Sequence, residues 1–406
     1  MNLGETGMQY NFDEIIPRRH TKSLKYDFAK EHGKPEDLLP MWVADMDFQT
    51  PPAVREALAD KAAHGIFGYS DPDEPYFEAL ATWFKARHNW TVDPHTAVLT
   101  PGVVFAICTL IRCLTKVGDA ILIQEPVYYC FRLGIRDNGR RTVVNELRFD
   151  GERYTIDFED FERKIIENGV KLFILCSPHN PVGRVWTKEE LEKLAEICLR
   201  HDVFVVADEI HEDFVYPGSR HIVFSTLSKE IADRCAVCTS PSKTFNLAGL
   251  HNANIFIANN EVRRAVRHEL DAEGFSQSNI MGLVACQTAY QTGVEWVDQL
   301  VDYLRGNLSL MRETFRTRMP QLRLIEPEAT YLPWVDFSGL GLSAPELERF
   351  IVERAKLWLD GGRIFGAGGA GFQRFNIATP RAILQQALDQ LEKVVSSQRF
   401  GCAEIM

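Results

Sequence analysis

Several features are missing from this 406-residue sequence, and each absence excludes a class of protein. No apolar run approaches the ~18 residues that a membrane-spanning helix needs. The formal net charge is -11 and there is no dense basic stripe, so nucleic acid is not expected as the main partner, because phosphate neutralisation needs clustered Lys and Arg. Residues 1–14 lack a basic region followed by an apolar one, so we expect no signal peptide. Without repeats, low-complexity stretches or charged linkers, the chain predicts one continuous fold.

The cysteines do not form the pattern of a disulfide framework. There are nine, an odd number, scattered along the chain and several of them inside apolar segments. This usage is typical of reduced thiols and favours a cytoplasmic location. Cys235 and Cys238 have CxxC spacing, but no second CxxC and no Cys/His pair at zinc-finger spacing accompanies them. We therefore expect two thiols of a core strand rather than a metal or redox site.

What the sequence does contain is an alternation of short apolar, β-branched runs with longer helix-like patterns. Residues 188–200, for example, place Leu191, Leu194, Ala195 and Cys198 on one helical face. Strands that alternate with helices predict an α/β fold, with a mostly parallel seven-stranded sheet covered by helices on both faces. The seven expected strands are 98–99, 120–123, 142–146, 172–176, 203–207, 236–239 and 254–258.

The C-terminal third has a different pattern and predicts a smaller α+β domain. A long helix is expected at 294–319, strands at 322–325, 331–337 and 374–378, and further helices from Ser343 and Pro380. The first 50 residues are rich in Pro and turns, so we expect them to pack with this domain. The predicted organisation is an N-terminal segment (1–50), a large cofactor-binding domain (51–293) and a small C-terminal domain (294–406).

Residues that could bind a ligand, through polar side chains or backbone N–H groups, follow five of the expected strands. In open parallel sheets, ligands bind beyond the carboxyl ends of the strands, so these residues should converge on one edge. Each has a simpler interpretation as a turn former, a helix cap or an ordinary surface lysine, but the set as a whole favours a site. The residues are Gly102, Val103 and Val104; Tyr128; Asn180; Asp208 and His211; and Ser240, Ser242 and Lys243.

This combination matches the chemical needs of pyridoxal 5'-phosphate. Its aldehyde needs an amine, and a semi-enclosed Lys243 loses its charge more readily, so it can act as nucleophile and then base. Its ring nitrogen needs a carboxylate, which Asp208 can provide, and its ring oxygen needs a donor such as Asn180. Tyr128 can stack on the ring. The helix start at 102–104, with Ser240 and Ser242, suits the phosphate.

The ordered motifs also carry a family resemblance over nearly the whole chain. They resemble the aspartate-aminotransferase-like family (fold type I) of pyridoxal phosphate enzymes, through Asn180-Pro-x-Gly183, Asp208-Glu-Ile-His211, Ser240-Pro-Ser-Lys243 and Arg374-Phe-Asn-Ile-Ala-Thr-Pro380. The resemblance implies that Arg374 binds the α-carboxylate of an amino-acid substrate, for which a planar guanidinium is suited. The alternative for Arg374 is a salt bridge within the small domain. The nearby glycine-rich run 361–371 lacks the lysine and hydroxyl of a P-loop, and we interpret it as a flexible approach to Arg374.

Two N-terminal stretches narrow the resemblance to one branch. Residues 11–19 and 41–48 look like the MalY/PatB branch of cystathionine β-lyase-type C–S lyases, and so does His211 at the end of its motif. His251 departs from the arginine that aminotransferases often place on the phosphate. The branch implies elimination of a sulfur group from Cβ: Lys243 removes the Cα proton, a thiolate leaves, and pyruvate and ammonia follow.

The resemblance also implies further residues and a homodimer with its active site at the subunit interface. Tyr69 would reach the phosphate of the neighbouring subunit, although it could also be a simple loop aromatic; with Tyr128 it joins Lys243 among the candidate catalytic residues. Trp42 and Asp45 are candidates for the substrate entrance. Two other functions stay open: an aminotransferase that uses the same residues, and a cofactor-bound regulatory protein.

Overall fold

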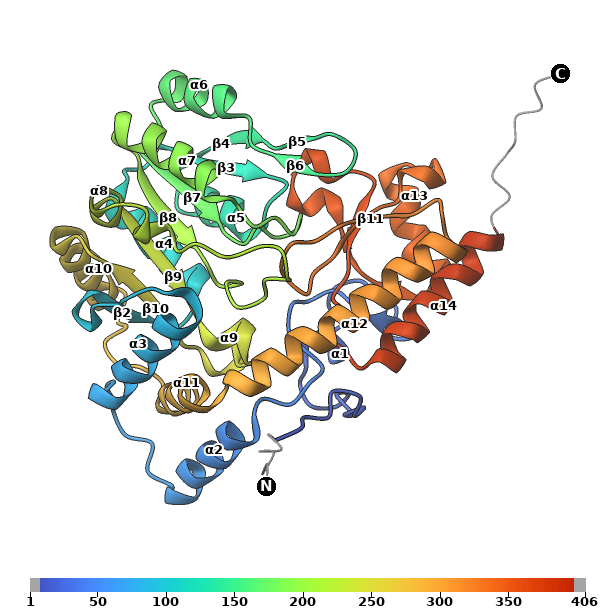
Figure 1. Cartoon of the computed structure of the whole chain (residues 1–406), viewed down its shortest axis with the longest axis horizontal. Helices are drawn as coiled ribbons and strands as arrows, with labels where there is room; N and C mark the ends of the chain where they lie inside the picture. The colour runs from blue at the N-terminus through green and yellow to red at the C-terminus, as the bar shows by residue number, and fades with distance from the viewer. Residues whose placement is uncertain (1–7, 398–406) are drawn as a thin grey trace, which may run out of the picture.

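The computed structural model of the protein describes residues 8–397. A seven-stranded sheet forms the large lobe, and the long helix α12 (Val294–Arg318) leads from it to a smaller lobe (Figure 1). The strands of the large sheet lie in the order β2-β10-β9-β8-β7-β3-β4. All pairs are parallel except those of β10, which runs antiparallel to both β2 and β9. The predicted α/β fold with a mostly parallel seven-stranded sheet is confirmed.

All seven predicted strands are present in this sheet, with shifts of one or two residues at their ends. The five inner strands are fully buried, as expected for strands covered on both faces, whereas the edge strand β4 alternates between buried and exposed residues. The observed bounds are β2 Ala97–Thr100, β3 Ala120–Glu125, β4 Arg141–Glu146, β7 Leu172–Cys176, β8 Phe204–Asp208, β9 Cys235–Thr239 and β10 Ala253–Ile257.

Each face of the sheet is covered by its own set of helices. One face packs on α4 (Val103–Leu114), α5 (Cys130–Asp137) and α10 (Asn260–Ala272). The other face packs on helices that include α3 (Glu74–His88), α6 (Phe158–Asn168), α7 (Lys188–Arg200) and α11 (Ile280–Thr292). The helix predicted at 188–200 is confirmed; Thr187 and Glu190 form a capping box at its start.

Cys235 and Cys238 are both buried free thiols in β9, but they belong to the cores on opposite faces of the sheet. Side chains three positions apart on a strand point to opposite faces, so the two sulfurs cannot bind one metal ion together. The prediction of two core-strand thiols is therefore confirmed.

The smaller lobe is built on a second sheet in the order β11-β12-β15-β14. The strand expected at 374–378 lies earlier in the chain, because only residues 372–374 pair with neighbouring strands. The N–H groups of residues 375–377 instead donate to loop carbonyls. Helix α14 (Arg381–Ser397) lies beside α12 (Figure 1). The other bounds are β11 Arg323–Ile325, β12 Trp334–Asp336, α13 Ala344–Arg349, β13 Leu357–Trp358, β14 Asp360–Gly361 and β15 Phe372–Arg374.

The N-terminal segment lies against the smaller lobe. Strand β1 (Leu39–Pro40) pairs in parallel with β13, although more than 300 residues separate them in sequence. It is followed by residues 41–48, whose side chains are largely buried. Helices α1 (Leu24–Asp27) and α2 (Pro52–His64) flank this region. The domain boundaries at residues 50 and 293 stay a prediction.

The glycine-rich run 361–371 leads to Arg374 through two closely packed turns, and its flexibility stays a prediction. It forms two short 3-10 turns, residues 362–365 and 367–369. A Cβ on Gly362 would lie 2.0 Å from the carbonyl oxygen of Gly369, so the two turns approach more closely than any other residue allows.

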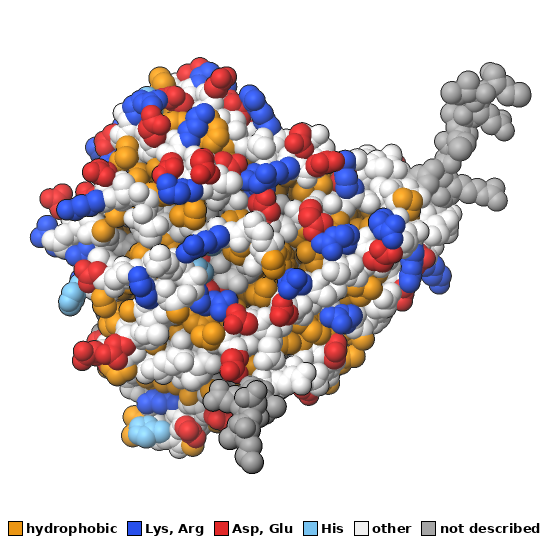
Figure 2. Space-filling view, in the orientation of Figure 1, with side chains coloured by type: hydrophobic (Ala, Val, Ile, Leu, Met, Phe, Trp, Pro, Cys, Tyr) orange, Lys and Arg blue, Asp and Glu red, His pale blue; other side chains and the backbone are white. Residues whose placement is uncertain are grey.

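The face of the molecule in Figure 2 shows Lys and Arg interspersed with Asp and Glu, and apolar side chains between them. No helix among residues 8–397 is long and apolar enough to cross a membrane.

Candidate active site

Most of the predicted site residues line one pocket at the carboxyl edge of the large sheet. The pocket has a volume of about 420 Å³ and lies between the strand ends, residues 42–44 and strands β14 and β15. The structure therefore brings together side chains from positions 42 to 374. The predicted residues that line it are Trp42, Gly102, Val103, Val104, Tyr128, Asn180, Asp208, His211, Ser240, Ser242, Lys243 and Arg374.

Two predicted residues do not line this pocket. Asp45 forms an ion pair of 2.5 Å with Arg18, although its charge still acts on Lys243. Tyr69 lies on the surface, where 95% of its side chain is exposed, in a stretch that also exposes Ile66 and Phe67. Its predicted contact is with a second subunit, so that role stays a prediction.

Lys243 lies on α9 (Pro241–Thr244), the short helix that follows β9, and points into the pocket. Its Nζ donates a hydrogen bond of 3.1 Å to the carbonyl oxygen of Ala44. Burial, aided by the positive charge of Arg374, lowers the pKa of Lys243 to about 8. A larger fraction of the amine is therefore neutral near pH 7 than for a lysine in water, and only the neutral amine is a nucleophile.

Asp208 ends β8 and is buried on the pocket floor. Burial raises the pKa of its carboxyl group to about 7, against the opposing effects of the Ile210 N–H and of Lys243. A basic nitrogen next to Asp208 would share a proton with its carboxyl group. The positive charge on the nitrogen and the negative charge on the carboxylate would then stabilise each other. His211 lies nearby with its pKa lowered to about 3 by burial, and its Nδ1 has no hydrogen-bond partner among the described residues.

The opposite end of the pocket is suited to an anion. Helix α4 begins at Val103 after Gly102, and the N–H groups of its first turn have no partner within the helix. Ser240 donates its hydroxyl hydrogen to the carbonyl oxygen of Asn252 (2.6 Å) and caps α9. Its main contribution is therefore to stabilise the turn between β9 and α9. Ser242 has no such bond among residues 8–397 and can donate. His251 lines the same pocket, in a left-handed backbone conformation with φ 51°.

Arg374 is 2% exposed and lies where strand β15 ends. Its Nη1 donates to Asn180 Oδ1 (3.0 Å), and its Nη2 donates to the Trp42 carbonyl oxygen (3.2 Å) and to Asp360. The salt bridge considered as an alternative is therefore present, and the residue still lines the pocket. Its Nε is buried and has no hydrogen-bond partner among residues 8–397, which leaves one donor for a ligand.

Several residues of the site were not anticipated. Asp360 follows an apolar run and could have been noticed as an acid at a strand end. Asn246 and Asn376 could not have been noticed, because their side chains bind backbone atoms that are far away in the sequence. Asn376 Nδ2 donates to the carbonyl oxygens of Val43 (2.6 Å) and Asp45 (2.7 Å). Asn246 Nδ2 binds the next carbonyls of the same segment in the same way.

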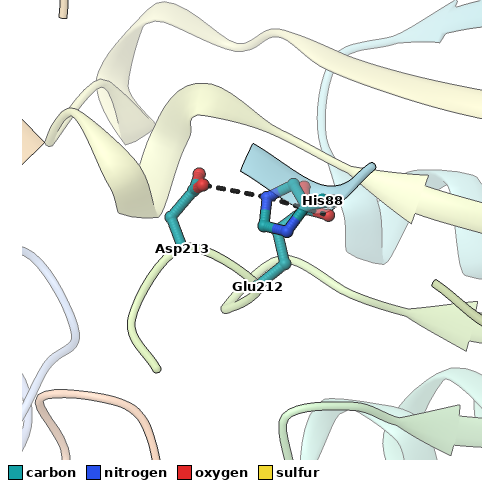
Figure 3. A group of neighbouring side chains, drawn as sticks. All are labelled: His88, Glu212 and Asp213. Carbon is teal, nitrogen blue, oxygen red and sulfur yellow. Dashed lines mark hydrogen bonds and ion pairs between the residues drawn. The ribbon is translucent and has the colours of Figure 1, made fainter. Parts of the chain in front are cut away.

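A buried polar network lies behind Lys243. The next residue, Thr244, donates to Asp213 (2.7 Å), whose other oxygen lies 3.0 Å from His88 Nε2. Figure 3 shows His88, Glu212 and Asp213 pointing toward one another. Burial would raise the pKa of Asp213, but His88, Arg87 and Thr244 lower it. Burial beside Asp213 and Glu209 raises the pKa of Glu212, although the charge of Arg87 opposes this effect.

The comparisons with known proteins agree with this geometry. The sequence model of the family "Aminotransferase class I and II" matches residues 36–391. The chain is 41% identical to cystathionine beta-lyase PatB of Bacillus subtilis over 95% of this chain and 100% of that protein. It is 33% identical to protein MalY of Escherichia coli over 96% of this chain and 100% of that protein.

Solved structures give the same result. Cystalysin of Treponema denticola, which contains pyridoxal 5'-phosphate, has a TM-score of 0.93 and 35% identity, over 96% of this chain and 100% of that one. A pyridoxal phosphate-bound C–S lyase of Staphylococcus hominis has a TM-score of 0.89 and 33% identity, over 96% of this chain and 99% of that one.

Proposed function

Because this chain belongs to the class I and II aminotransferase family, with C–S lyases among its relatives, we propose that it is a pyridoxal phosphate-dependent C–S β-lyase. Its reaction is the α,β-elimination of L-cystathionine or a related cysteine S-conjugate to a thiol, pyruvate and ammonia. The observation that carries the proposal is the meeting of a lysine with a lowered pKa, a buried carboxylate, a helix start and a buried arginine in one pocket.

The residues present fit the cofactor. When bound, pyridoxal phosphate supplies an aldehyde for the lysine amine and a ring that accepts electrons from Cα. Lys243 would hold it covalently, and Asp208 would keep a proton on its ring nitrogen. The N–H groups at 103–104 and the Ser242 hydroxyl would bind its phosphate. The Asn180 side chain accepts from Arg374 through Oδ1, so its Nδ2 remains available as a donor to the ring oxygen.

The remaining chemistry belongs to side chains of this chain. Arg374 would bind the α-carboxylate of the substrate through its unpartnered Nε and fix the orientation of Cα. Lys243, once its amine is free, would take the proton from Cα, since a pKa of about 8 makes it a base at neutral pH. Trp42 and Tyr128 in the walls would exclude water from the reacting atoms.

The test is to give the purified enzyme L-cystathionine without any keto acid. The proposal predicts that pyruvate and free thiol appear in equal amounts and that Lys243→Ala abolishes both. An absolute requirement for a keto-acid acceptor would contradict the lyase and favour the aminotransferase. Bound cofactor without turnover of any amino acid would favour a regulatory protein.

We also propose a homodimer in which Tyr69 reaches the pocket of the partner. The exposure of Ile66, Phe67 and Tyr69 in one stretch supports an interface there, because an exposed apolar cluster marks an association site. Light scattering should give twice the chain mass. The eight cysteines among residues 8–397 are free thiols, which supports the proposed location in the reducing cytoplasm.

A further inference from the structure

A second cavity adjoins the active-site pocket, and neither the proposed chemistry nor the cofactor uses it. This outer cavity has a volume of about 530 Å³ and lies between the N-terminal segment, α13 and the turns at 362–369. It shares three lining residues with the inner pocket: Trp42, Tyr129 and Asp360. A substituent that leaves the inner pocket past these side chains therefore enters the outer cavity.

One wall of the outer cavity is a rigid aromatic surface. The Trp42 and Trp358 rings are stacked, with centroids 4.2 Å apart and an interplanar angle of 9°. The His32 ring meets Trp42 edge-on at 5.3 Å. Both tryptophans are nearly buried in a small apolar cluster with Ala29 and Leu38. This wall is suited to the methylene groups of a flexible chain, because their burial is favourable and needs no directed bond.

The rest of the outer cavity carries polar groups of both signs. Gln373 is 2% exposed, and its Oε1 has no hydrogen-bond partner in the described part of the chain, although a buried amide oxygen without a partner is costly. Lys34 and Glu348 form an ion pair at the edge. Arg363 is exposed, and no carboxylate among residues 8–397 lies within ion-pairing distance of it. The cavity thus offers an acceptor for an ammonium group and a guanidinium for a carboxylate.

Asp360 connects the two cavities. It bonds to Arg374 Nη2, beside the Nε that has no partner. A substrate carboxylate that binds the Nε and Nη2 edge of Arg374 with both oxygens must take over the hydrogen bond of Asp360. The Asp360 carboxylate is 8% exposed, so the loss of this bond would leave a buried charge that needs another cation. A cation bound in the outer cavity, which Asp360 also lines, can pair with it.

We propose that the outer cavity binds the distal amino-acid group of a substrate in which a thioether joins two amino acids. The distal ammonium lies among Asp360, Gln373 and Glu348, and the distal carboxylate lies on Arg363. The methylene groups pass along the Trp42–Trp358 wall. This inference rests on the proposed lyase function and names its substrate class: zwitterionic S-conjugates are preferred to small or purely apolar ones.

The test compares two substrates that differ only beyond the sulfur, L-cystathionine and S-methyl-L-cysteine. Gln373→Leu and Arg363→Ala should each lower kcat/KM for L-cystathionine about tenfold, mainly through KM, because each removes one hydrogen bond to a charged group. The values for S-methyl-L-cysteine should change less than about twofold. Arg136→Ala removes an exposed arginine remote from both cavities and serves as the matched control.

Two further readouts separate binding from structure. Gln373→Leu should melt at the same temperature as the unaltered enzyme or higher, because no hydrogen bond of this side chain is lost. Calorimetric titration of L-cystathionine into a Lys243→Ala background should show the same loss of affinity without turnover. An equal loss for both substrates, or no loss for either, would overturn the inference. No pyruvate from either substrate with the unaltered enzyme would instead overturn the proposed function, and this inference with it.

Discussion

The reactivity of Lys243 gives the most direct quantitative prediction. Its pKa is lowered from 10.5 to about 8, first by burial and then by Arg374. At pH 7, about one amine in ten is then neutral, compared with about one in 3,000 for an unperturbed lysine, a ratio of about 300. Because the folded-state pKa is lowered, the reactive neutral form increases as pH rises through 8 rather than through 10.5.

The assay adds pyridoxal phosphate to cofactor-stripped enzyme and follows the yellow absorption between pH 6 and 10. The initial rate should rise about tenfold per pH unit and level off above pH 8, because the neutral fraction of Lys243 does so. Replacement of Arg374 by Gln should move the inflection upward, since the guanidinium is the second cause of the shift. An inflection near 10.5, or one unmoved by Arg374→Gln, would refute the electrostatic reasoning; Lys243→Ala should give no absorption at all.

Four substitutions test the rest of the site and the polar network behind it. Asp208→Asn should retain bound cofactor but lower kcat about a hundredfold or more, because a neutral amide cannot stabilise a charged ring nitrogen; unchanged turnover of cystathionine would contradict this role. Arg374→Gln should raise KM and lower kcat/KM about a hundredfold, with a smaller effect on substrate analogues that lack the α-carboxylate. Asp213→Asn should cost about 2–3 kcal/mol of unfolding free energy in urea at pH 7. Because the folded-state pKa of Asp213 is lowered, this difference should disappear as pH falls through that pKa. Glu212→Gln, its neighbour with a raised pKa, should instead be neutral or stabilising at pH 8 and serves as its control.

The large sheet could be predicted from sequence because its strands are short, continuous apolar runs whose burial on both faces leaves few alternatives. The strand-end residues followed from the same pattern, since parallel strands place their carboxyl ends together. Lys243, Asp208 and Asn180 therefore converge as expected.

Contacts between distant segments could not be predicted in this way. Nothing near Asp360 indicates that it pairs with Arg374, and nothing near Leu39 indicates that it pairs with Leu357. The strand expected at 374–378 was misplaced because its apolar residues are buried without belonging to a ladder. The close packing of the turns in the glycine-rich run was not predicted, because glycine permits close packing as readily as mobility.

The carbonyl oxygens of residues 42–48 accept hydrogen bonds from Arg374, Asn376, Lys243 and Asn246, so a segment made early in synthesis meets partners made at its end. A nascent chain cannot complete the site until strand β15 has left the ribosome, even though the lysine appears 130 residues earlier. Premature release of the polypeptide would yield a chain that holds the Lys243 amine and these carbonyl oxygens but lacks Arg374 and Asn376, which donate to them. Cofactor capture is therefore expected to follow, not to guide, the final step of folding, and to report on completion of the whole chain.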